Sequence, residues 1–523
     1  MSTSTNLARA TIRTLIECGV NTFVLSPGSR NAPLSIALYE ASSKGLVDLH
    51  VKIDERGAGF FALGISKASD NYVAVICTSG TAAVNYHPAI LEAYHGANNL
   101  LVITADRPAR LRSTGANQTT NQNNIFGDIK SHDIAAPIDI RALLLGGPVH
   151  LNIQFDEPLL PTDSNDWLAG LEIVPIESNN ENCETISLTE KSVIVIGHDC
   201  GTFTVEEIRE GLAGLRVPII AEDPISFPEA LAHASIVLAD EGIRSALQAD
   251  QVIVIGRTTL SRSINAFINE ANRQIVIDPR MATIDTARSA DQKLRQLPNF
   301  VGAPSIQYFD NWKLASDSAH ADLHNLHQFS EHTAARSIVA QLPNDAALFI
   351  GSSRPIRDIE AFASPRKGIT TFANRGLAGI DGNISTAFGI AENFDRSYAI
   401  LGDITFMHDL SALVAPTTAN LTIFVIDNNG GGIFSTLPQA GVEGFEKIFG
   451  TPQNVDLERI VIGYGINVEK VKSESDLHRV IAAQEKGLRV VIVEVPERSE
   501  MAAGLKGIYQ SVSSAVRIGL NLA

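Results

Sequence analysis

Two polar side chains follow short apolar runs in the last third of the sequence, where they could bind a metal ion. Asp403 ends the run SYAILGD (397–403), and Asn428 follows the run LTIFVID (421–427). Carboxylate and amide oxygens are ligands that Mg²⁺ prefers, and the ion usually shares its coordination with a diphosphate. Gly430 would add its carbonyl, because glycine permits the tight turn that aims it inward. Two ordinary strand–turn junctions would explain the same residues, so the pattern alone leaves both interpretations open.

Glu55, in the segment DERGAGFFALG, stands at the start of an expected helix. The apolar residues Phe60, Leu63 and Ala68 follow it in that segment. An acid in the first turn complements the helix dipole, which is worth about 0.3–1 kcal/mol. Taken alone, Glu55 is therefore expected to be a structural residue.

Four arginines lie in turns that are rich in glycine or proline and follow expected strands. They are Arg30 in SPGSRNAP, Arg107 in TADRPAR, Arg357 in SSRPIRD and Arg375 in ANRGLAG. The planar guanidinium fork binds carboxylates through two hydrogen bonds, so this placement predicts clamps for a carboxylate substrate. The amide-rich loop GANQTTNQNN adds Asn117 and Gln118, although a polar surface loop would explain that run equally well.

These candidate residues require strands that end directly before them, because ligands of parallel α/β sheets bind at the carboxyl ends of strands. Short β-branched runs recur along the chain, each followed by a segment of helical character. Such an alternation predicts parallel sheets covered by helices on both faces. It occurs three times, which predicts an α/β protein with three doubly wound parallel-sheet domains. The expected strands are 22–29, 47–54, 72–80, 99–106 and 147–153, then 192–199, 217–223, 251–258 and 273–279, and finally 347–353, 397–403, 421–429 and 488–496.

Two segments without strand pattern separate these groups and set the expected domain boundaries. Residues 157–190 are rich in Asp, Asn, Ser and Pro. Residues 314–334 hold four histidines, whose irregular spacing favours a solvated linker helix over a metal-binding tract. The predicted domains are therefore 1–165, 185–325 and 335–523.

Composition and charge exclude several classes of protein. The 523 residues suffice for three or four domains at about 150 residues each, and 45% hydrophobic residues are ordinary for a globular protein. A net charge of −17 repels phosphate backbones, so no nucleic-acid partner is expected. The cysteines Cys18, Cys77, Cys183 and Cys200 form no CxxC pair, and no run of 18 apolar residues occurs. A cytoplasmic protein without a membrane partner is expected.

A set of motifs in a fixed order resembles one enzyme family. The segments SPGSRNAPLSIAL, DERGAGFFALGISKAS, TSGTAAVNYHPAILEA, TADRP, GANQ, GPVHLN, SSRPIRD, NRGLAGIDGNISTA, GDITFMHDL and NNGGGIFSTLP are similar to those of the 2-succinyl-5-enolpyruvyl-6-hydroxy-3-cyclohexene-1-carboxylate synthases. These are the thiamine-diphosphate enzymes of menaquinone biosynthesis. The resemblance is dense over 20–155 and 350–450 and thin over 157–340.

The resemblance implies a fold, a cofactor and an assembly. A pyrimidine-binding domain would come first, a central domain second, and a pyrophosphate- and Mg²⁺-binding domain last. The cofactors would be thiamine diphosphate and Mg²⁺, with Mn²⁺ as an alternative ion. Active sites would lie between chains of a homo-oligomer, and the sequence does not separate a dimer from a tetramer.

The resemblance also implies roles for individual residues. Glu55 would hydrogen-bond the aminopyrimidine ring of the cofactor, and Asp403, Asn428 and Gly430 would hold the metal. The catalytic set would be Glu55, Arg30, Gln118 and Arg375. The substrate set would be Ser29, Arg30, Arg107, Asn117, Gln118, Arg262, Ser353, Arg357, Arg375 and Ile380. The cofactor set would be Glu55, Thr78, Gly402, Asp403, Ile404, Thr405, Asn428, Gly430, Gly432, Ile433 and Phe434.

The implied reaction is the decarboxylation of 2-oxoglutarate and the addition of the resulting succinyl carbanion to isochorismate. Both substrates carry two carboxylates, which gives the arginines a reason to converge. One alternative is another thiamine-diphosphate carboligase or decarboxylase, similar to acetolactate synthase, with smaller substrates. A nucleotide-binding dehydrogenase is disfavoured because no GxGxxG follows an expected strand. A non-catalytic homologue is disfavoured because Glu55, Asp403 and Asn428 are all present.

Overall fold

The computed structural model describes residues 3–163, 165–174, 184–280, 285, 289–414, 417–483 and 486–522. The chain divides into two compact units. The first comprises Met1–Asn180, Gly376–Asn393 and His408–Thr417, and the second comprises Glu181–Arg375, Phe394–Met407 and Thr418–Ala523. Cys183 lies outside the described residues, and the other three cysteines are free and buried. The predicted domain boundaries stay a prediction.

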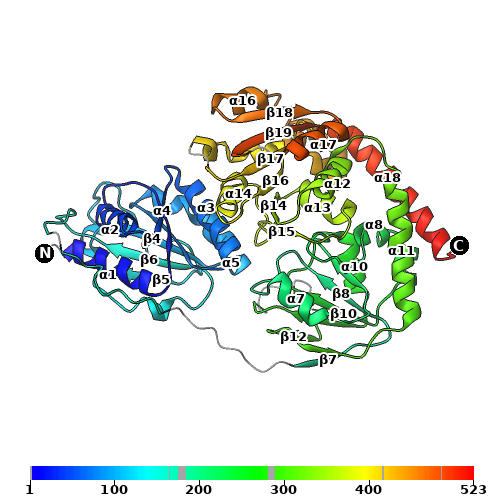
Figure 1. The fold of residues 1–523 in the computed structure, drawn as a ribbon, viewed down its shortest axis with the longest axis horizontal. Helices are drawn as coiled ribbons and strands as arrows, with labels where there is room; N and C mark the ends of the chain where they lie inside the picture. The colour runs from blue at the N-terminus through cyan, green and yellow to red at the C-terminus, as the bar shows by residue number, and fades with distance from the viewer. Residues whose placement is uncertain are drawn as a thin grey trace. The chain divides into compact units, whose positions relative to one another are not determined.

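The first unit is built on a six-stranded parallel sheet with the order β2-β1-β3-β4-β6-β5 (Figure 1). Helices α1 and α2 pack on one face, against residues such as Phe23, Ile76 and Ile103. Helices α3 and α5 contact the strands β1, β3 and β4. The strands are β1 (Thr22–Leu25), β2 (Asp48–Val51), β3 (Val73–Cys77), β4 (Leu100–Asp106), β5 (Ser131–Ile134) and β6 (Val149–Gln154), and the helices are α1 (Thr3–Glu17), α2 (Ala32–Ser43), α3 (Glu55–Ser69), α4 (Thr81–Asn85), α5 (His87–Gly96), α6 (Ala109–Arg112) and η1 (Arg141–Leu143).

Two later segments, α14 (Asn383–Ala391) and η2 (Leu410–Val414), also belong to the first unit. Helix α14 packs closely on α3. A Cβ atom at Gly64 would lie 2.2 Å from the Thr386 carbonyl oxygen, and one at Gly389 would lie 2.0 Å from the Phe61 carbonyl oxygen. Only glycine at these two positions lets the helix backbones approach so closely.

The second unit contains two further parallel sheets. The five-stranded sheet has the order β12-β11-β10-β8-β9, and the six-stranded sheet has the order β15-β14-β16-β17-β19-β18. Strands β7 (Thr185–Ser187) and β13 (Asn299–Val301) form a separate two-stranded parallel pair. Neighbouring residues along β8 and β10 enter two different apolar cores, so the five-stranded sheet is buried on both faces.

The elements of the second unit follow the expected alternation of strand and helix. Figure 1 shows α18 running beside α11, and the two helices are in contact. The strands of the two sheets are β8 (Ser192–Ile196), β9 (Ile219–Ala221), β10 (Gln251–Ile255), β11 (Arg273–Ile277), β12 (Gln292–Leu294), β14 (Ala346–Ile350), β15 (Ile369–Phe372), β16 (Ser397–Gly402), β17 (Leu421–Asp427), β18 (Asn467–Val471) and β19 (Leu488–Glu494). The helices are α7 (Val205–Leu212), α8 (Ala234–Val237), α9 (Glu241–Ala246), α10 (Arg262–Asn269), α11 (Ile306–His324), α12 (Glu331–Gln341), α13 (Arg354–Phe362), α15 (Asp403–His408), η3 (Gly432–Thr436), η4 (Pro438–Gly441), η5 (Glu446–Gly450), α16 (Leu457–Gly463), α17 (Glu474–Ala483) and α18 (Arg498–Gly519).

The predicted fold class, α/β with several doubly wound parallel sheets, is confirmed. Within the described part of the chain, no helix is both long enough and apolar enough to cross a membrane. The expectation of a solvated linker helix over 314–334 is wrong in part. His320, His324 and His327 are exposed, but Ala315 and Ala319 lie in an apolar core and His332 is buried. The reason is that α11 packs on α18 and α12 packs on α13.

Candidate active site

The structure brings the predicted metal ligands together at the carboxyl ends of two neighbouring strands of the second unit. Asp403 follows β16 directly, and Asn428 follows the neighbouring strand β17. The Asp403 carboxylate accepts a hydrogen bond from the Gly430 N–H at 2.7 Å and another from the Ile404 N–H at 2.7 Å. The strand-end carboxylate thus holds the loop that carries the other two candidate ligands.

The side-chain oxygen of Asn428 is an unpaired acceptor within the described structure. Its side chain is buried, and its Nδ2 donates to Glu331 Oε2 at 3.0 Å. Its Oδ1 is also buried and has no hydrogen-bond partner among the described residues. Buried acceptors are normally paired, so an unpaired one indicates a missing ligand.

Three consecutive glycines shape the loop around this oxygen. Gly430 has φ 138°, and a Cβ there would lie 2.2 Å from the Gly450 carbonyl oxygen. A Cβ at Gly431 would lie 2.4 Å from the Phe449 carbonyl oxygen, and one at Gly432 would lie 2.4 Å from Asn428 Nδ2. The loop therefore tolerates no side chain at these positions.

The electrostatics of the turn favour a cation. Burial raises the pKa of Asp403 to about 7, and the charge of Asp427 adds to this, against the opposing effects of Ile404, Gly430 and Arg498. Carboxylate, amide and carbonyl oxygens are the donor set that suits a hard divalent ion. The Gly430 carbonyl accepts one bond, from the Gly432 N–H at 2.9 Å, and keeps a second lone pair. The residues present thus fit Mg²⁺.

Residues predicted to surround the cofactor lie on both sides of this turn. Gly402, Ile404 and Thr405 flank Asp403 at the junction of β16 and α15. Ile433 and Phe434 belong to η3 and are half-buried, and the Phe434 ring lies 5.4 Å from that of Phe449. A half-exposed apolar wall beside an oxygen-lined turn suits a cofactor with one charged and one aromatic end.

Glu55 occupies the first position of α3 in the first unit, but it does not cap the helix. The cap is Asp54, whose carboxylate accepts a hydrogen bond from the Arg56 N–H at 3.1 Å. Glu55 is half-buried. Burial raises the pKa of Cys77 and that of Tyr86, and the negative charge of Glu55 contributes to both shifts. Glu55 thus does not make the capping hydrogen bond, but it is the acidic residue in the first turn of α3 that the sequence led us to expect.

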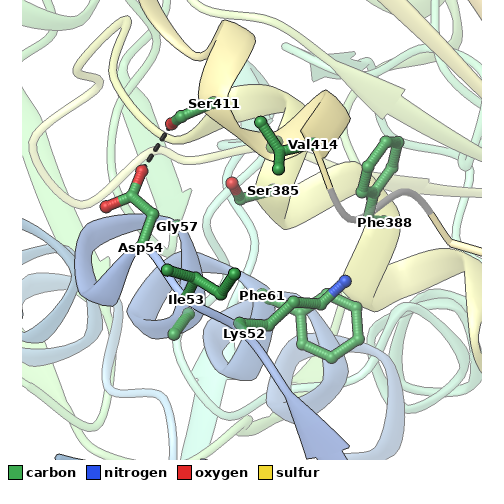
Figure 2. A pocket seen from close by; sticks show the side chains of 11 residues that line it. Lys52, Ile53, Asp54, Gly57, Phe61, Ser385, Phe388, Ser411 and Val414 are labelled. Carbon is green, nitrogen blue, oxygen red and sulfur yellow. Dashed lines mark hydrogen bonds between the residues drawn. The ribbon is translucent and has the colours of Figure 1, made fainter. Parts of the chain in front are cut away.

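A pocket of about 150 Å³ lies beside the first turn of α3, entirely within the first unit (Figure 2). The Lys52 ammonium lies 4.5 Å from the centre of the Phe61 ring, and Asp54 accepts a hydrogen bond from Ser411. The lining is Lys52, Ile53, Asp54, Gly57, Ala58, Phe61, Ser385, Phe388, Ser411, Ala412 and Val414. None of these is a predicted site residue, so the pocket receives no role in the proposed chemistry.

The first unit also gathers two of the four predicted arginines. Arg107 donates to Ser79 Oγ at 3.0 Å and to the Gln118 carbonyl at 2.9 Å. Burial lowers the pKa of Arg107, and the positive charge of Arg30 adds to this effect. The Arg30 N–H donates to Thr78 Oγ1 at 3.3 Å. Arg30 also lies 3.4 Å from the exposed Glu157 carboxylate and donates to the Phe155 carbonyl at 3.2 Å. Two arginines at the carboxyl edge of one sheet are candidates to bind a substrate anion.

The other two arginines meet buried carboxyl groups in the second unit. Arg375 is buried and donates to Glu222 Oε1 at 2.6 Å. Arg357 donates to the Ser353 carbonyl, and Ser353 has φ 77° at the start of α13. Burial lowers the pKa of Arg357, and the charges of Arg354 and Arg375 add to it.

Glu360 lies near Arg357, Arg375 and Glu222, and these four residues form the second arginine cluster. Burial and then the charge of Glu222 raise the pKa of Glu360 to about 8, against a hydrogen bond from Thr259 and the charges of Arg375 and Arg357. Glu360 is therefore mainly neutral at pH 7. The cluster then holds two guanidinium groups against the single carboxylate of Glu222.

Other predicted residues do not join these clusters through any interaction described for them. Arg262 is exposed at the start of α10, Ser29 and Asn117 are exposed, and Ile380 is half-buried. Gln118 is exposed with φ 58°, and only its carbonyl has described contacts, with Ser79 and Arg107. The roles assigned to these five side chains stay predictions.

Three acidic residues of the second unit were not predicted from the sequence. Glu222, Glu331 and Glu360 contact or surround predicted site residues. A signal existed for Glu222, because it lies at the end of an expected strand, 217–223, in the same way as Asp403 lies at the end of 397–403. Glu331 and Glu360 stand in ordinary helical sequence, which carries no such signal.

Comparison with known proteins identifies the family. Residues 5–125 match the N-terminal TPP binding domain of thiamine pyrophosphate enzymes, and residues 356–495 match their C-terminal TPP binding domain. Proteins named 2-succinyl-5-enolpyruvyl-6-hydroxy-3-cyclohexene-1-carboxylate synthase are similar over nearly the whole chain. The one from Saccharopolyspora erythraea is 34% identical and covers 100% of both chains. The one from Thermobifida fusca is 34% identical over 99% of this chain and 100% of its own, and the one from a Nocardioides species is 36% identical over 93% and 94%. The chain belongs to this family of thiamine pyrophosphate enzymes.

Proposed function

We propose that the protein joins 2-oxoglutarate to isochorismate, with loss of carbon dioxide, to give 2-succinyl-5-enolpyruvyl-6-hydroxy-3-cyclohexene-1-carboxylate for menaquinone biosynthesis. The observation that carries the choice of substrates is the placement of two arginines at one sheet edge: the Arg30 N–H donates to Thr78 Oγ1, and Arg107 donates to Ser79 Oγ and the Gln118 carbonyl. Two guanidinium groups placed together have their charges balanced by a bound carboxylate. A carboligase with a small monocarboxylate substrate, the alternative function, has less need of such a pair.

The metal would be held by Asp403, Asn428 and the Gly430 carbonyl. Mg²⁺ is the proposed ion and Mn²⁺ the alternative, because both accept oxygen ligands. The neighbouring Gly402, Ile404, Thr405 and Gly432 would surround the diphosphate, with Ile433 and Phe434 against the apolar part of the cofactor. When bound, thiamine diphosphate supplies a nucleophilic carbon and an electron sink for decarboxylation.

Glu55 would hold a proton at the pyrimidine ring of the cofactor. A carboxylate that accepts a hydrogen bond from a ring nitrogen favours the protonated form of that nitrogen. Since Asp54 already caps α3, the Glu55 carboxylate is available for this task. Thr78, whose hydroxyl lies beside the Arg30 N–H, would contact the same ring.

Arg30, Arg107, Arg357 and Arg375 would bind and orient the substrate carboxylates. Arg375 is paired with Glu222, so a substrate carboxylate would have to share or replace that partner. Ser29, Asn117, Gln118, Arg262, Ser353 and Ile380 would complete the substrate contacts. A clamp of this kind contributes to the rate by fixing the reacting groups in position.

We further propose a cytoplasmic homo-oligomer in which Glu55 of one chain serves the metal-binding turn of another, with no nucleic-acid or membrane partner. A mixing experiment tests the shared site. Glu55→Gln and Asp403→Ala proteins, each inactive alone, would be unfolded and refolded together. Sites shared between two chains would restore activity in about a quarter of the sites, whereas sites within one chain would restore none.

The direct test of the proposed activity is a turnover assay with the full-length protein. Product is expected with 2-oxoglutarate and isochorismate together, and only when thiamine diphosphate and a divalent cation are present. Pyruvate in place of 2-oxoglutarate is the control. Faster turnover of pyruvate would favour the alternative carboligase.

Glu55→Gln provides a residue-level prediction. Cofactor binding should survive, because the diphosphate and the metal are held elsewhere. Hydrogen–deuterium exchange at the thiazolium carbon of the bound cofactor should slow by about 10²–10⁴-fold, the usual contribution of a positioned proton-transfer group. Equal exchange in wild type and variant would mean that Glu55 takes no part in the proton transfer.

A further inference from the structure

The amide group of Asn428 has one fixed partner and one open end. Its Nδ2 donates to Glu331 Oε2 at 3.0 Å, and its buried Oδ1 has no hydrogen-bond partner among the described residues. The terminal torsion of asparagine is broad and roughly two-fold, so rotation would exchange these two atoms at little cost. A neighbouring group must therefore hold the amide in one of its two orientations, with either Oδ1 or Nδ2 toward the metal position.

The Glu331 carboxylate selects the orientation of the Asn428 amide. A carboxylate has only acceptors, so it pairs with the NH₂ end of an amide and not with the oxygen end. With Nδ2 held by Glu331, Oδ1 points away from the carboxylate. A metal ion requires the oxygen, because an amide NH₂ offers no lone pair to a cation.

Glu331 is itself held in place. It is buried, it is the first residue of α12, and the preceding Ser330 caps that helix by accepting from the Thr333 N–H. The Arg354 Nε lies 3.4 Å from Glu331 Oε1, the oxygen that does not face Asn428. Each carboxylate oxygen thus has its own neighbour, which fixes the orientation of the group.

The residues around Glu331 resemble a second metal site, but the Arg354 guanidinium already pairs with their carboxylates. Glu331, His332 and Asp358 lie close enough together to share an ion. Arg354 forms ion pairs with Glu331 and Asp358, and His332 Nδ1 lies 2.8 Å from Asp358 Oδ1. The positive charge that such a cluster needs therefore comes from Arg354, and the cluster acts as a buried support.

We propose that Glu331 is a positioning residue for the metal: it orients the Asn428 amide so that Oδ1, and not Nδ2, faces the ion. This rests on the proposed function, because it assumes that Asn428 is a metal ligand. Partners of this outer kind typically change metal affinity by about 10–100-fold when they are replaced.

Glu331→Gln is the sharpest variant. The glutamine must present its own oxygen either to Arg354 or to Asn428. The guanidinium has only donors, so it takes the oxygen, and the glutamine NH₂ then faces Asn428. The Asn428 amide would flip to pair with it and would turn its NH₂ toward the metal position.

The measurement is titration of the full-length protein with Mn²⁺ in the presence of thiamine diphosphate, followed by the electron paramagnetic resonance signal of free Mn²⁺. Glu331→Gln should bind Mn²⁺ about 10–100-fold more weakly than wild type. Glu331→Asp, which keeps the charge beside Arg354 but withdraws the carboxylate from Asn428, should also bind more weakly and covers the case in which the glutamine variant fails to fold. Asp240→Asn is the control, since Asp240 pairs with Arg517 and caps α9; its Mn²⁺ affinity should match wild type.

A double variant separates orientation from a general charge effect. If Glu331 acts through the amide, Glu331→Gln should change Mn²⁺ affinity by less than about twofold in an Asn428→Ala background. An equal effect in both backgrounds, or wild-type affinity in both Glu331 variants, would overturn the proposal. The proposed metal site would fail in a different way, with Asn428→Ala and Asp403→Ala both binding Mn²⁺ as tightly as wild type.

Discussion

Replacing Glu360 by glutamine should make the protein less sensitive to alkaline pH. Burial, and next the charge of Glu222, raise the pKa of Glu360 from 4.5 to about 8. A raised carboxyl pKa means that the folded protein favours the protonated form. The resulting contribution to stability is complete below the ordinary pKa of 4.5 and is lost progressively as the pH rises to about 8. Glutamine resembles the neutral acid at every pH and so removes this dependence.

The size of the effect follows from the two pKa values. One pKa unit corresponds to about 1.4 kcal/mol. Between pH 6 and pH 9, the wild type should therefore lose on the order of 2–3 kcal/mol of unfolding free energy through Glu360 alone. Urea denaturation at several pH values in this range would measure the unfolding free energy of wild type and of Glu360→Gln. The difference between the two free energies isolates Glu360, because the other groups titrate in both proteins.

A kinetic consequence accompanies the change in stability. Ionised Glu360 would place a second negative charge near Arg357 and Arg375, in competition with a substrate carboxylate. Above pH 8, KM should rise more steeply in wild type than in Glu360→Gln. Parallel pH profiles of stability for the two proteins would refute the reasoning, because they would show that Glu360 does not titrate in this range.

Three further substitutions test other parts of the structure. Asp403→Ala should keep a near-native melting temperature but weaken binding of Mg²⁺ and thiamine diphosphate by about tenfold or more; calorimetric titration decides, and unchanged affinity would contradict the assignment. Arg107→Lys keeps the charge but loses the planar fork, so KM should rise by about tenfold for one substrate more than for the other; normal kinetics with a lower melting temperature would indicate a purely structural arginine. Gly64→Ala would drive a Cβ to 2.2 Å from the Thr386 carbonyl oxygen and should cost about 1–3 kcal/mol in urea denaturation, whereas Gly211→Ala, with open space around its Cβ, should cost nothing.

The central strands and the edge strands β2 and β9 were predicted from the sequence, whereas other edge strands were missed. β5, β12, β15 and β18 each lie at the end of a sheet, and β7 and β13 pair only with each other. A central strand of a parallel sheet is buried on both faces and reads as a continuous apolar run. The edge strand β18, with its first four residues partly or fully exposed, carries no such run, and its composition did not distinguish it from a loop.

Some residues of the candidate site could be predicted from the sequence, and others could not. Asp403 and Asn428 could be predicted to meet because neighbouring parallel strands deliver their ends to one edge. The partners of these residues could not be predicted, because Glu331 lies 97 residues from Asn428 and Glu222 lies 153 residues from Arg375 in the sequence. Such contacts depend on how whole helices and sheets pack, and no local pattern records that packing. The exclusion of Glu55 from the capping role likewise required the side-chain geometry of Asp54.

The close contact of α3 with α14 limits how this protein can be divided into fragments. In the sequence α14 lies between β15 and β16, two strands of the third sheet, yet it belongs to the first unit. A fragment that ends at residue 174 would lack α14 and would leave the glycine-lined surface of α3, with the adjoining Phe61, uncovered. Such a fragment should aggregate when it is expressed alone and become soluble when a peptide spanning 376–417 is supplied in trans. The compact units of this protein therefore do not coincide with continuous segments of its sequence.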